Sequence, residues 1–188
     1  MKEEDIYLKL KSMISEERYN HSLGVQKTAV KLAKKYNADV AKASLAGLIH
    51  DCAKGFSTDE LLKLAKEFKI GIKKIFVMQP ELLHGPVGAY VARRDFGVND
   101  EEILHSIEYH TTGCENMSML DKIIYMADFI EPNRDFEGVE KLRTAAFEDI
   151  DKGVLLAIES TILYVINRGQ LLDTLTVDAR NFILCQNK

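Results

Sequence analysis

Hydrophobic residues recur along most of the chain at the three-to-four-residue spacing of a buried helix face. In the stretch after residue 20, Val25, Ala29, Leu32 and Ala33 share one side of a helix. No segment alternates apolar and polar residues at hairpin spacing, and the chain has only three prolines. The pattern predicts an all-α fold, with residues 1–188 forming a single helical-bundle domain.

Short polar side chains followed by acidic residues mark the expected helix starts. The predicted caps are Ser57 with Glu60 ahead of LLKLAKEF, Ser118 with Asp121 ahead of LDKIIYMADFI, Asp39 ahead of VAKASLAGLIHD, and Asn99 with Glu102 ahead of ILHSIEYH. Glycines separate the helical stretches, at positions where a positive φ costs little: Gly55, Gly71, Gly97, Gly113 and Gly138.

Composition narrows the class of protein. Hydrophobic residues make up 46% and charged residues 29%, as in ordinary globular proteins, and the net charge of −4 argues against a non-specific nucleic-acid binder. No apolar run approaches the roughly 18 residues of a membrane span, and the N-terminal residues show no signal-peptide core. We expect a cytoplasmic protein with neither nucleic acid nor membrane as partner; the oligomeric state stays open, a homodimer included.

The three cysteines, Cys52, Cys114 and Cys185, lie far apart and form no CxxC pair. Their spacing predicts free thiols in a reducing compartment. We therefore expect no thiolate metal site.

The candidate chemistry centres on GLIHDCAKG, residues 47–55, where His50 and Asp51 follow small and apolar residues. Adjacent helical residues point about 100° apart, but both can reach one ion where a helix ends. Asp51 has two oxygens and can bridge two cations, and an imidazole with a carboxylate suits Fe, Mn or Zn better than Ca. The alternative is a surface pair at a helix C-terminus.

Two further residues lie in apolar surroundings. His21 begins the apolar stripe described above, as either a metal ligand or a partly buried structural histidine. Asp128 follows the apolar run IIYMA, where an unpaired carboxylate would be costly to bury. A cation would offset that cost, and Arg134 offers a plain salt bridge instead.

The other histidines are less distinctive. His84 precedes a Gly-Pro pair and can be a ligand or cap a turn, and His110 can be a ligand or complement the dipole at a helix end. His105 lies five residues before His110, about 140° around the same helix. We expect His105 to face away from the ligand side.

Cationic and hydroxyl side chains flank these residues. Lys54 can project toward a phosphate or complement a helix dipole in solvent. Arg134, in a loop stiffened by proline, can hold a phosphate or pair with a neighbouring carboxylate on the surface. Thr111 and Thr112 can form a phosphate-facing turn or simply end a helix.

Five segments in order resemble the YqeK family of the HD superfamily: RYNHSLGV, GLIHDCAKG, LLHGPVGA, EYHTTG and ADFIEPNRDFEGV. His21, then His50-Asp51, then Asp128 match the H…HD…D order of that superfamily. The likeness extends from about Arg18 to the last helix. An HD dipeptide alone is a weak motif, whereas five matching segments are highly specific.

This resemblance implies an all-α HD domain that cleaves diadenosine tetraphosphate symmetrically to two ADP, with a di-iron centre and an activated water. It implies a dinucleoside polyphosphate as the small-molecule substrate, with ADP or a GDP-like product. Histidine and carboxylate ligands also admit Mn, Co or Zn. The implied metal ligands are His21, His50, Asp51 and Asp128 for one ion, and His84 and His110 for the other, with Asp51 shared. The predicted catalytic residues are Asp51, Lys54 and Arg134, and the predicted substrate contacts are Lys54, Thr111, Thr112 and Arg134.

Two other functions stay open. Another HD phosphohydrolase, acting on a nucleoside monophosphate, a deoxynucleoside triphosphate or a cyclic dinucleotide, would share Asp51 and the metals but lack the EPNR and EYHTTG segments. A non-catalytic nucleotide sensor would lack ligands. Here every ligand position is filled, which disfavours a sensor.

Overall fold

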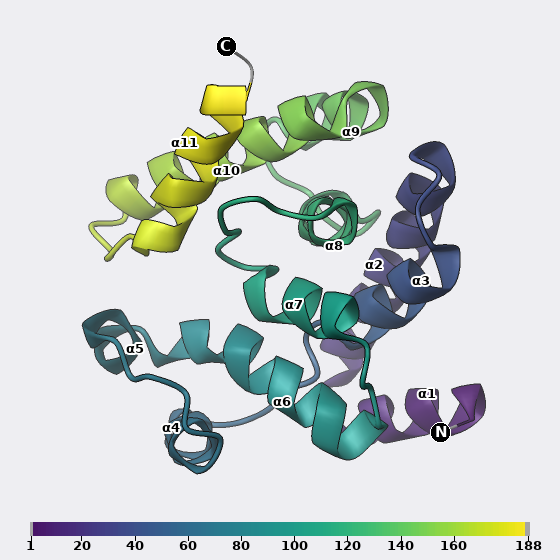
Figure 1. Cartoon of the computed structure of the whole chain (residues 1–188), viewed down its shortest axis with the longest axis vertical. Coiled ribbons are helices and arrows are strands. Elements are labelled where there is room, and N and C mark those ends of the chain that lie inside the picture. Colours follow the sequence, from purple (N-terminus) through teal and green to yellow (C-terminus); the bar gives the residue numbers. More distant parts are fainter. Residues whose placement is uncertain (1, 187–188) are drawn as a thin grey trace.

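The computed structural model describes residues 2–186, and this range contains helices and no strand (Figure 1). The predicted all-α fold is confirmed. The helices are α1 (Glu3–Met13), α2 (Glu16–Lys35), α3 (Val40–Ile49), α4 (Thr58–Glu67), α5 (Lys74–Met78), the 3-10 helix η1 (Pro80–Leu83), α6 (His84–Phe96), α7 (Glu101–Tyr109), α8 (Met119–Ile130), α9 (Val139–Glu148), α10 (Ile150–Asn167) and α11 (Thr174–Gln186).

Helix α8 runs through the middle of the bundle, between α4–α7 and α9–α11 (Figure 1). Helices α2, α3, α7, α9 and α10 all contact it. Its residues Ile123, Ile124 and Met126 are fully buried in a core that is continuous from the N-terminal to the C-terminal helices. Because its last turn carries Asp128, the core fixes the position of that carboxylate.

Three of the four predicted helix caps are confirmed. Ser57 and Ser118 form complete capping boxes, and Asp39 accepts hydrogen bonds from two amides of α3. The prediction for Asn99 is wrong: Asp100 caps α7, accepting from two amides of the first turn. Asp100 directly precedes the helix, whereas the Asn99 side chain donates to a loop carbonyl.

Left-handed backbone occurs at three of the five expected glycines, Gly97, Gly113 and Gly138. Beyond α4 the left-handed residue is Lys69, with φ 57°, and not Gly71. The left-handed residue after α4 therefore lies two residues before the predicted glycine.

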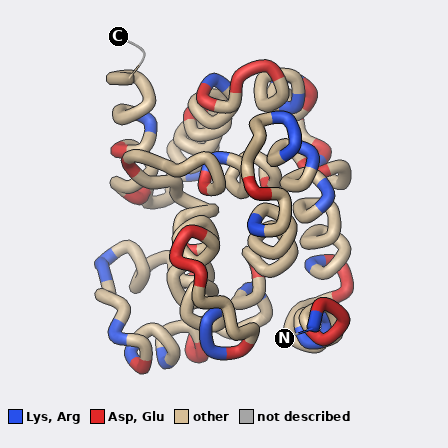
Figure 2. Tube along the Cα trace, turned by 45° about the vertical axis from the view of Figure 1, so that its right-hand side comes forward, with Lys and Arg blue, Asp and Glu red and all other residues tan. Residues whose placement is uncertain are grey.

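Lys, Arg, Asp and Glu are interspersed along the chain trace (Figure 2), in keeping with the small net charge of −4. Across residues 2–186, none of the helices combines the length and the apolar character needed to cross a membrane.

Candidate metal centre

The six side chains predicted as metal ligands converge where α2, α3, α6, α7 and α8 meet. His21 lies in the second turn of α2, His50 and Asp51 follow α3, His84 is the first residue of α6, His110 follows α7, and Asp128 lies in the last turn of α8. Five are buried, and Asp128 is partly buried. Residues 107 positions apart in the sequence thus line one small space.

A glycine allows two of the contributing helices to approach closely. A Cβ at Gly85 would lie 2.5 Å from the carbonyl oxygen of Glu108 in α7. Because this position has no side chain, the start of α6 packs directly on the end of α7. Nε2 of His84 consequently lies 3.1 Å from Nε2 of His110.

The donor atoms form three overlapping groups, one of them His50, His110 and Asp128, and the other two share Asp51. His21, His50 and Asp51 offer atoms within 4.8 Å of one another, and so do Asp51, His84 and His110. Asp51 Oδ2 lies 3.7 Å from His50 Nε2, while Oδ1 lies 3.4 Å from His84 Nε2 and 3.5 Å from His110 Nε2. The carboxylate therefore faces both groups, one oxygen toward each.

Three buried atoms of this cluster have no hydrogen-bond partner: His21 Nε2, His50 Nε2 and Asp51 Oδ1. Nε2 of His21 lies 2.9 Å from Asp128 Oδ1, but without the alignment of a hydrogen bond. Buried polar atoms without partners are costly, and a cation would satisfy them together. The donors fit a divalent metal.

In all four histidines of the cluster, the Nδ1 atom, which faces away from the other donors, makes a hydrogen bond. In His50, His84 and His110, Nδ1 donates to the backbone carbonyl three residues earlier, at 2.9 Å for His50 and 2.7 Å for His110. In His21, Nδ1 donates to the Glu131 carboxylate at 3.1 Å. Because these bonds keep the proton on Nδ1, the lone pair of each Nε2 is directed into the cluster.

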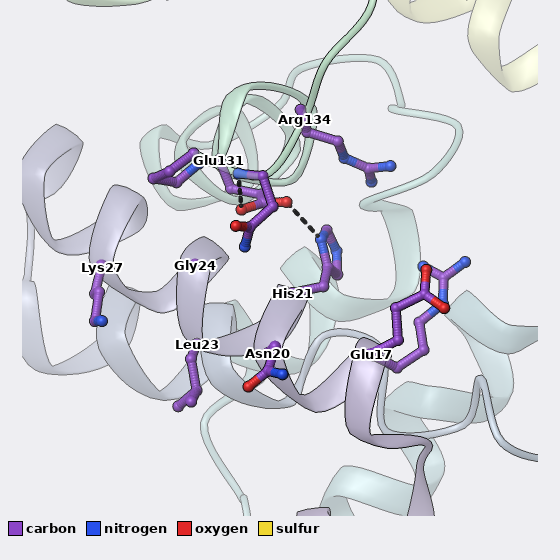
Figure 3. A pocket seen from close by; sticks show the side chains of 11 residues that line it. Glu17, Asn20, His21, Leu23, Gly24, Lys27, Glu131 and Arg134 are labelled. Atoms are coloured by element: carbon purple, nitrogen blue, oxygen red, sulfur yellow. Dashed lines mark hydrogen bonds and ion pairs between the residues drawn. The ribbon is translucent and has the colours of Figure 1, made fainter.

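Sequence analysis did not select Glu131, whose carboxylate was only one of two, with Asp135, that could pair with Arg134 on the surface. Glu131 is 1% exposed, and its second oxygen accepts a hydrogen bond from the Asn133 amide at 2.8 Å (Figure 3). A Cβ at Gly24, one turn after His21, would collide with that oxygen. The glycine in RYNHSLGV was the available signal, because it leaves room for a carboxylate beside the histidine.

Three cations border the cluster. Lys54 Nζ lies 3.3 Å from both ring nitrogens of His84. Arg134 donates to Asp128 from Nη2 to Oδ1 at 2.6 Å and from Nε to the backbone oxygen at 2.9 Å. Arg18, which sequence analysis did not select, lies 3.3 Å from Asp51 Oδ2. The carboxylates are thus charge-balanced in the metal-free chain.

The structure separates the two predicted threonines. Thr111 Oγ1 lies 3.1 Å from Nε2 of both His84 and His110, at the edge of the cluster. Thr112 donates its hydroxyl hydrogen to the Gly113 carbonyl within its own turn, at 2.9 Å. The geometry therefore brings Thr111 to the centre more directly than Thr112.

Burial and neighbouring charges set the protonation of the cluster. Burial lowers the pKa of His50 to about 4; burial together with Lys54 lowers that of His84 to about 3. Burial alone would raise the pKa of Asp51, but the adjacent His50 and the other imidazoles hold it well below its usual value. Neutral imidazoles and an ionised carboxylate are the forms that bind metals.

An open cavity of about 580 Å³ adjoins the cluster on the side of α2 (Figure 3). Its lining includes His21 of the cluster, the neighbouring Glu131, Arg134 and Arg18, and also Lys27. The cavity therefore gives access to the buried donors from a surface that carries three cationic side chains.

The HD domain matches residues 18–133, a range that contains all six side chains of the cluster. The chain is 42% identical over 179 residues to a protein of Halalkalibacterium halodurans named bis(5'-nucleosyl)-tetraphosphatase, symmetrical, and the match covers 95% of both chains. A Bacillus subtilis protein of the same name is 39% identical over 170 residues, 90% of this chain and 91% of that one.

A crystal structure of a Clostridium acetobutylicum protein, described as a predicted HD superfamily hydrolase involved in NAD metabolism, superposes with a TM-score of 0.97 at 42% identity. The superposition covers 99% of this chain and 98% of that chain. The matched domain, the relatives and the fold agree with one another. The chain belongs to the HD-domain family, and within it to the YqeK family that its motifs resemble.

Proposed function

We propose that this chain hydrolyses diadenosine tetraphosphate symmetrically to two molecules of ADP at a centre of two metal ions. The observation that carries the proposal is the position of Asp51 between two groups of donors, one oxygen facing each. Relatives that match nearly the whole chain are named for the same reaction. Free thiols and the absence of a membrane-spanning helix in residues 2–186 are compatible with a cytoplasmic location.

We assign His21, His50 and Asp128 to one ion, His84 and His110 to the other, and Asp51 to both. These nitrogen and carboxylate donors admit Fe, Mn, Co or Zn, and we propose iron, as the family resemblance implies. When bound, such a pair of ions activates a water molecule and neutralises phosphate charge.

The side chains around the cluster orient the substrate. Lys54 and Arg134 each present a cationic group beside a proposed ligand, where a bridging polyphosphate would lie. Thr111 adds a hydroxyl beside His84 and His110. The adjoining cavity is large enough for a nucleotide-sized group, so we place one nucleoside there, with Arg134 at the junction.

The chain needs no dedicated proton donor for the leaving group. In symmetrical cleavage the leaving group is a nucleoside diphosphate, which departs readily once its charge is neutralised. Lys54 can neutralise that charge. Burial lowers the pKa of its ammonium group, but the nearby Asp51 favours the charged form. The ammonium thus lies desolvated at the site, where its interaction with phosphate is strong.

The proposal is tested with purified protein, defined metals and a panel of nucleotides separated by chromatography. Diadenosine tetraphosphate should be the best substrate, and Asp51→Ala should be inactive on every compound. Preferred hydrolysis of a nucleoside monophosphate, a deoxynucleoside triphosphate or a cyclic dinucleotide would instead assign another phosphohydrolase activity. Nucleotide binding without turnover under any metal would favour a sensor.

A further inference from the structure

A second group of potential metal ligands lies between α7 and α8, outside the six-residue centre. His105, Cys114 and Asp121 each offer one donor atom, and the three atoms lie within 4.8 Å of one another. Asp121 and Cys114 are 2% and 8% exposed, whereas the His105 side chain is 45% exposed. The group is therefore anchored in the core and open to solvent on the imidazole side.

We propose that His105, Cys114 and Asp121 bind an additional cation of the zinc class. A thiolate, an imidazole and a carboxylate are all ligands that Zn²⁺ accepts in tetrahedral sites, whereas Ca²⁺ and Mg²⁺ prefer oxygen alone. Three protein ligands leave one position for water on the exposed side. This proposal departs from the expectation of no thiolate metal site, which rested on cysteine spacing; the donors here come from a helix, a loop and the next helix.

The contacts already present leave the donors available. Nδ1 of His105 lies 3.0 Å from Asp121 Oδ1, close enough for both to reach one ion through bonds of about 2.0–2.2 Å after a small shift. The other oxygen, Oδ2, accepts the hydrogen bond from the Ser118 amide that caps α8. Asp121 can thus bind an ion through Oδ1 without giving up its capping role.

The surroundings of Cys114 are negatively charged. Burial, with the carboxylates of Asp121, Glu108 and Glu115, raises the pKa of its thiol to about 12 in the metal-free chain. The same carboxylates attract a cation, and a coordinated thiol loses its proton outright. The bound ion would tie the end of α7 to the start of α8, across the connection that carries His110.

Cobalt reports this site separately from the six-residue centre, which contains no sulfur. Chelated full-length protein refilled with Co²⁺ should bind a third equivalent that shows sulfur-to-cobalt charge-transfer absorption in the near ultraviolet, and Zn²⁺ should displace it. Cys114→Ser and His105→Ala should each lose that absorption and one equivalent of cobalt. Both should retain the two sulfur-free equivalents and the far-ultraviolet circular dichroism of the wild type.

Cys185→Ser is the matched control, because Cys185 is the exposed thiol most able to bind cobalt non-specifically. It should keep the absorption unchanged. Absence of the sulfur band in the wild type, its persistence in Cys114→Ser, or its loss in Cys185→Ser would overturn the proposal and leave His105–Asp121 as a plain hydrogen bond. None of these outcomes alters the two sulfur-free equivalents, so they do not bear on the proposed hydrolase activity.

Discussion

The carboxylate of Glu131 orients the imidazole of His21 through a 3.1 Å hydrogen bond to Nδ1, and Gly24 provides the room for it. Both side chains are almost fully withdrawn from solvent. A carboxylate on the outer nitrogen fixes the tautomer and makes Nε2 a better ligand. The pair therefore links a glycine on α2 to the strength of the proposed metal centre.

Disturbing this pair should weaken metal binding without unfolding the chain. Gly24→Ala places a methyl group against Glu131 Oε2, and Glu131→Gln removes the charge. Each should reduce metal affinity about ten- to a hundred-fold, measured by competition with a chromophoric chelator. Gly71→Ala is the control, because no atom lies within 4 Å of its added Cβ. Unchanged affinity in both test variants would assign Glu131 a purely structural role.

Much of this centre could be predicted from the sequence because its donors lie in short motifs. His50 and Asp51 are adjacent, and the order of the remaining donors along the chain matches a known pattern. Glu131 was not selected, because its burial depends on contact with α2, more than a hundred residues earlier, and only Gly24 hinted at it. Arg18 was missed for the same reason, since it meets Asp51 only through the packing of α2 on α3.

Prediction of the fold from the sequence also succeeded only where the relevant residues are close together in the chain. Helix periodicity and Ser caps predicted the helices, because both depend on residues close in sequence. Asn99 and Asp100 are adjacent, and both are residue types that cap helices. The sequence alone does not define which of them directly precedes the first helical residue of α7. Cys114 gave no signal, because its neighbours His105 and Asp121 meet it only after α7 and α8 have packed.

Metal content should follow the sharing of Asp51. In a Cys114→Ser background, which removes the additional proposed site, protein purified without chelator should contain close to two ions per chain by elemental analysis. Asp51→Ala should lose both, because its oxygens face both donor groups, and His84→Ala should lose mainly one. Full metal retention in Asp51→Ala would contradict the bridging assignment.

Lys54 and Arg134 should affect substrate turnover more than metal content. A charge-assisted hydrogen bond contributes roughly 1.5–3 kcal/mol, so Lys54→Ala and Arg134→Ala should lose about ten- to a hundred-fold in kcat/KM while keeping both ions. Arg134→Lys should recover part of the loss, because an ammonium cannot reproduce a two-pronged contact. Exposed Lys63 supplies the control, Lys63→Ala.

The proposed phosphate contacts of Lys54 and Arg134 can be contradicted independently of each other. Because Arg134 also bonds Asp128, loss of metal in Arg134→Ala would make it a support for that ligand and not a phosphate contact. Wild-type kcat/KM in Lys54→Ala would show that this lysine only neutralises the neighbouring carboxylates.

The chelated chain should lose stability as the pH falls from about 6.5 toward 4. Burial lowers the pKa of His50 to about 4 and, with Lys54, that of His84 to about 3, so in this range the unfolded chain binds protons that these folded residues do not. Burial would lower the pKa of His21, but Asp128 outweighs burial and raises it, so His21 is protonated in both the folded and the unfolded chain over most of this range and adds little to the slope. The net effect in the middle of this range is close to two protons, or ~2.7 kcal/mol per pH unit.

Urea unfolding at several pH values measures this slope. His84→Gln should flatten it, because one of the two buried neutral imidazoles is removed. A chelated chain whose stability is constant or rises from pH 6.5 to 4 would contradict the buried neutral state of these histidines.

The site of bond cleavage tests the central claim most directly. Diadenosine tetraphosphate is hydrolysed by the metal-loaded protein in ¹⁸O-labelled water, and the products are separated and their masses measured by mass spectrometry. Symmetrical attack predicts ADP as the only nucleotide product, with one ADP of each pair carrying a single heavy oxygen on its terminal phosphate. A mixture of ATP and AMP, or ADP without the heavy oxygen, would contradict it.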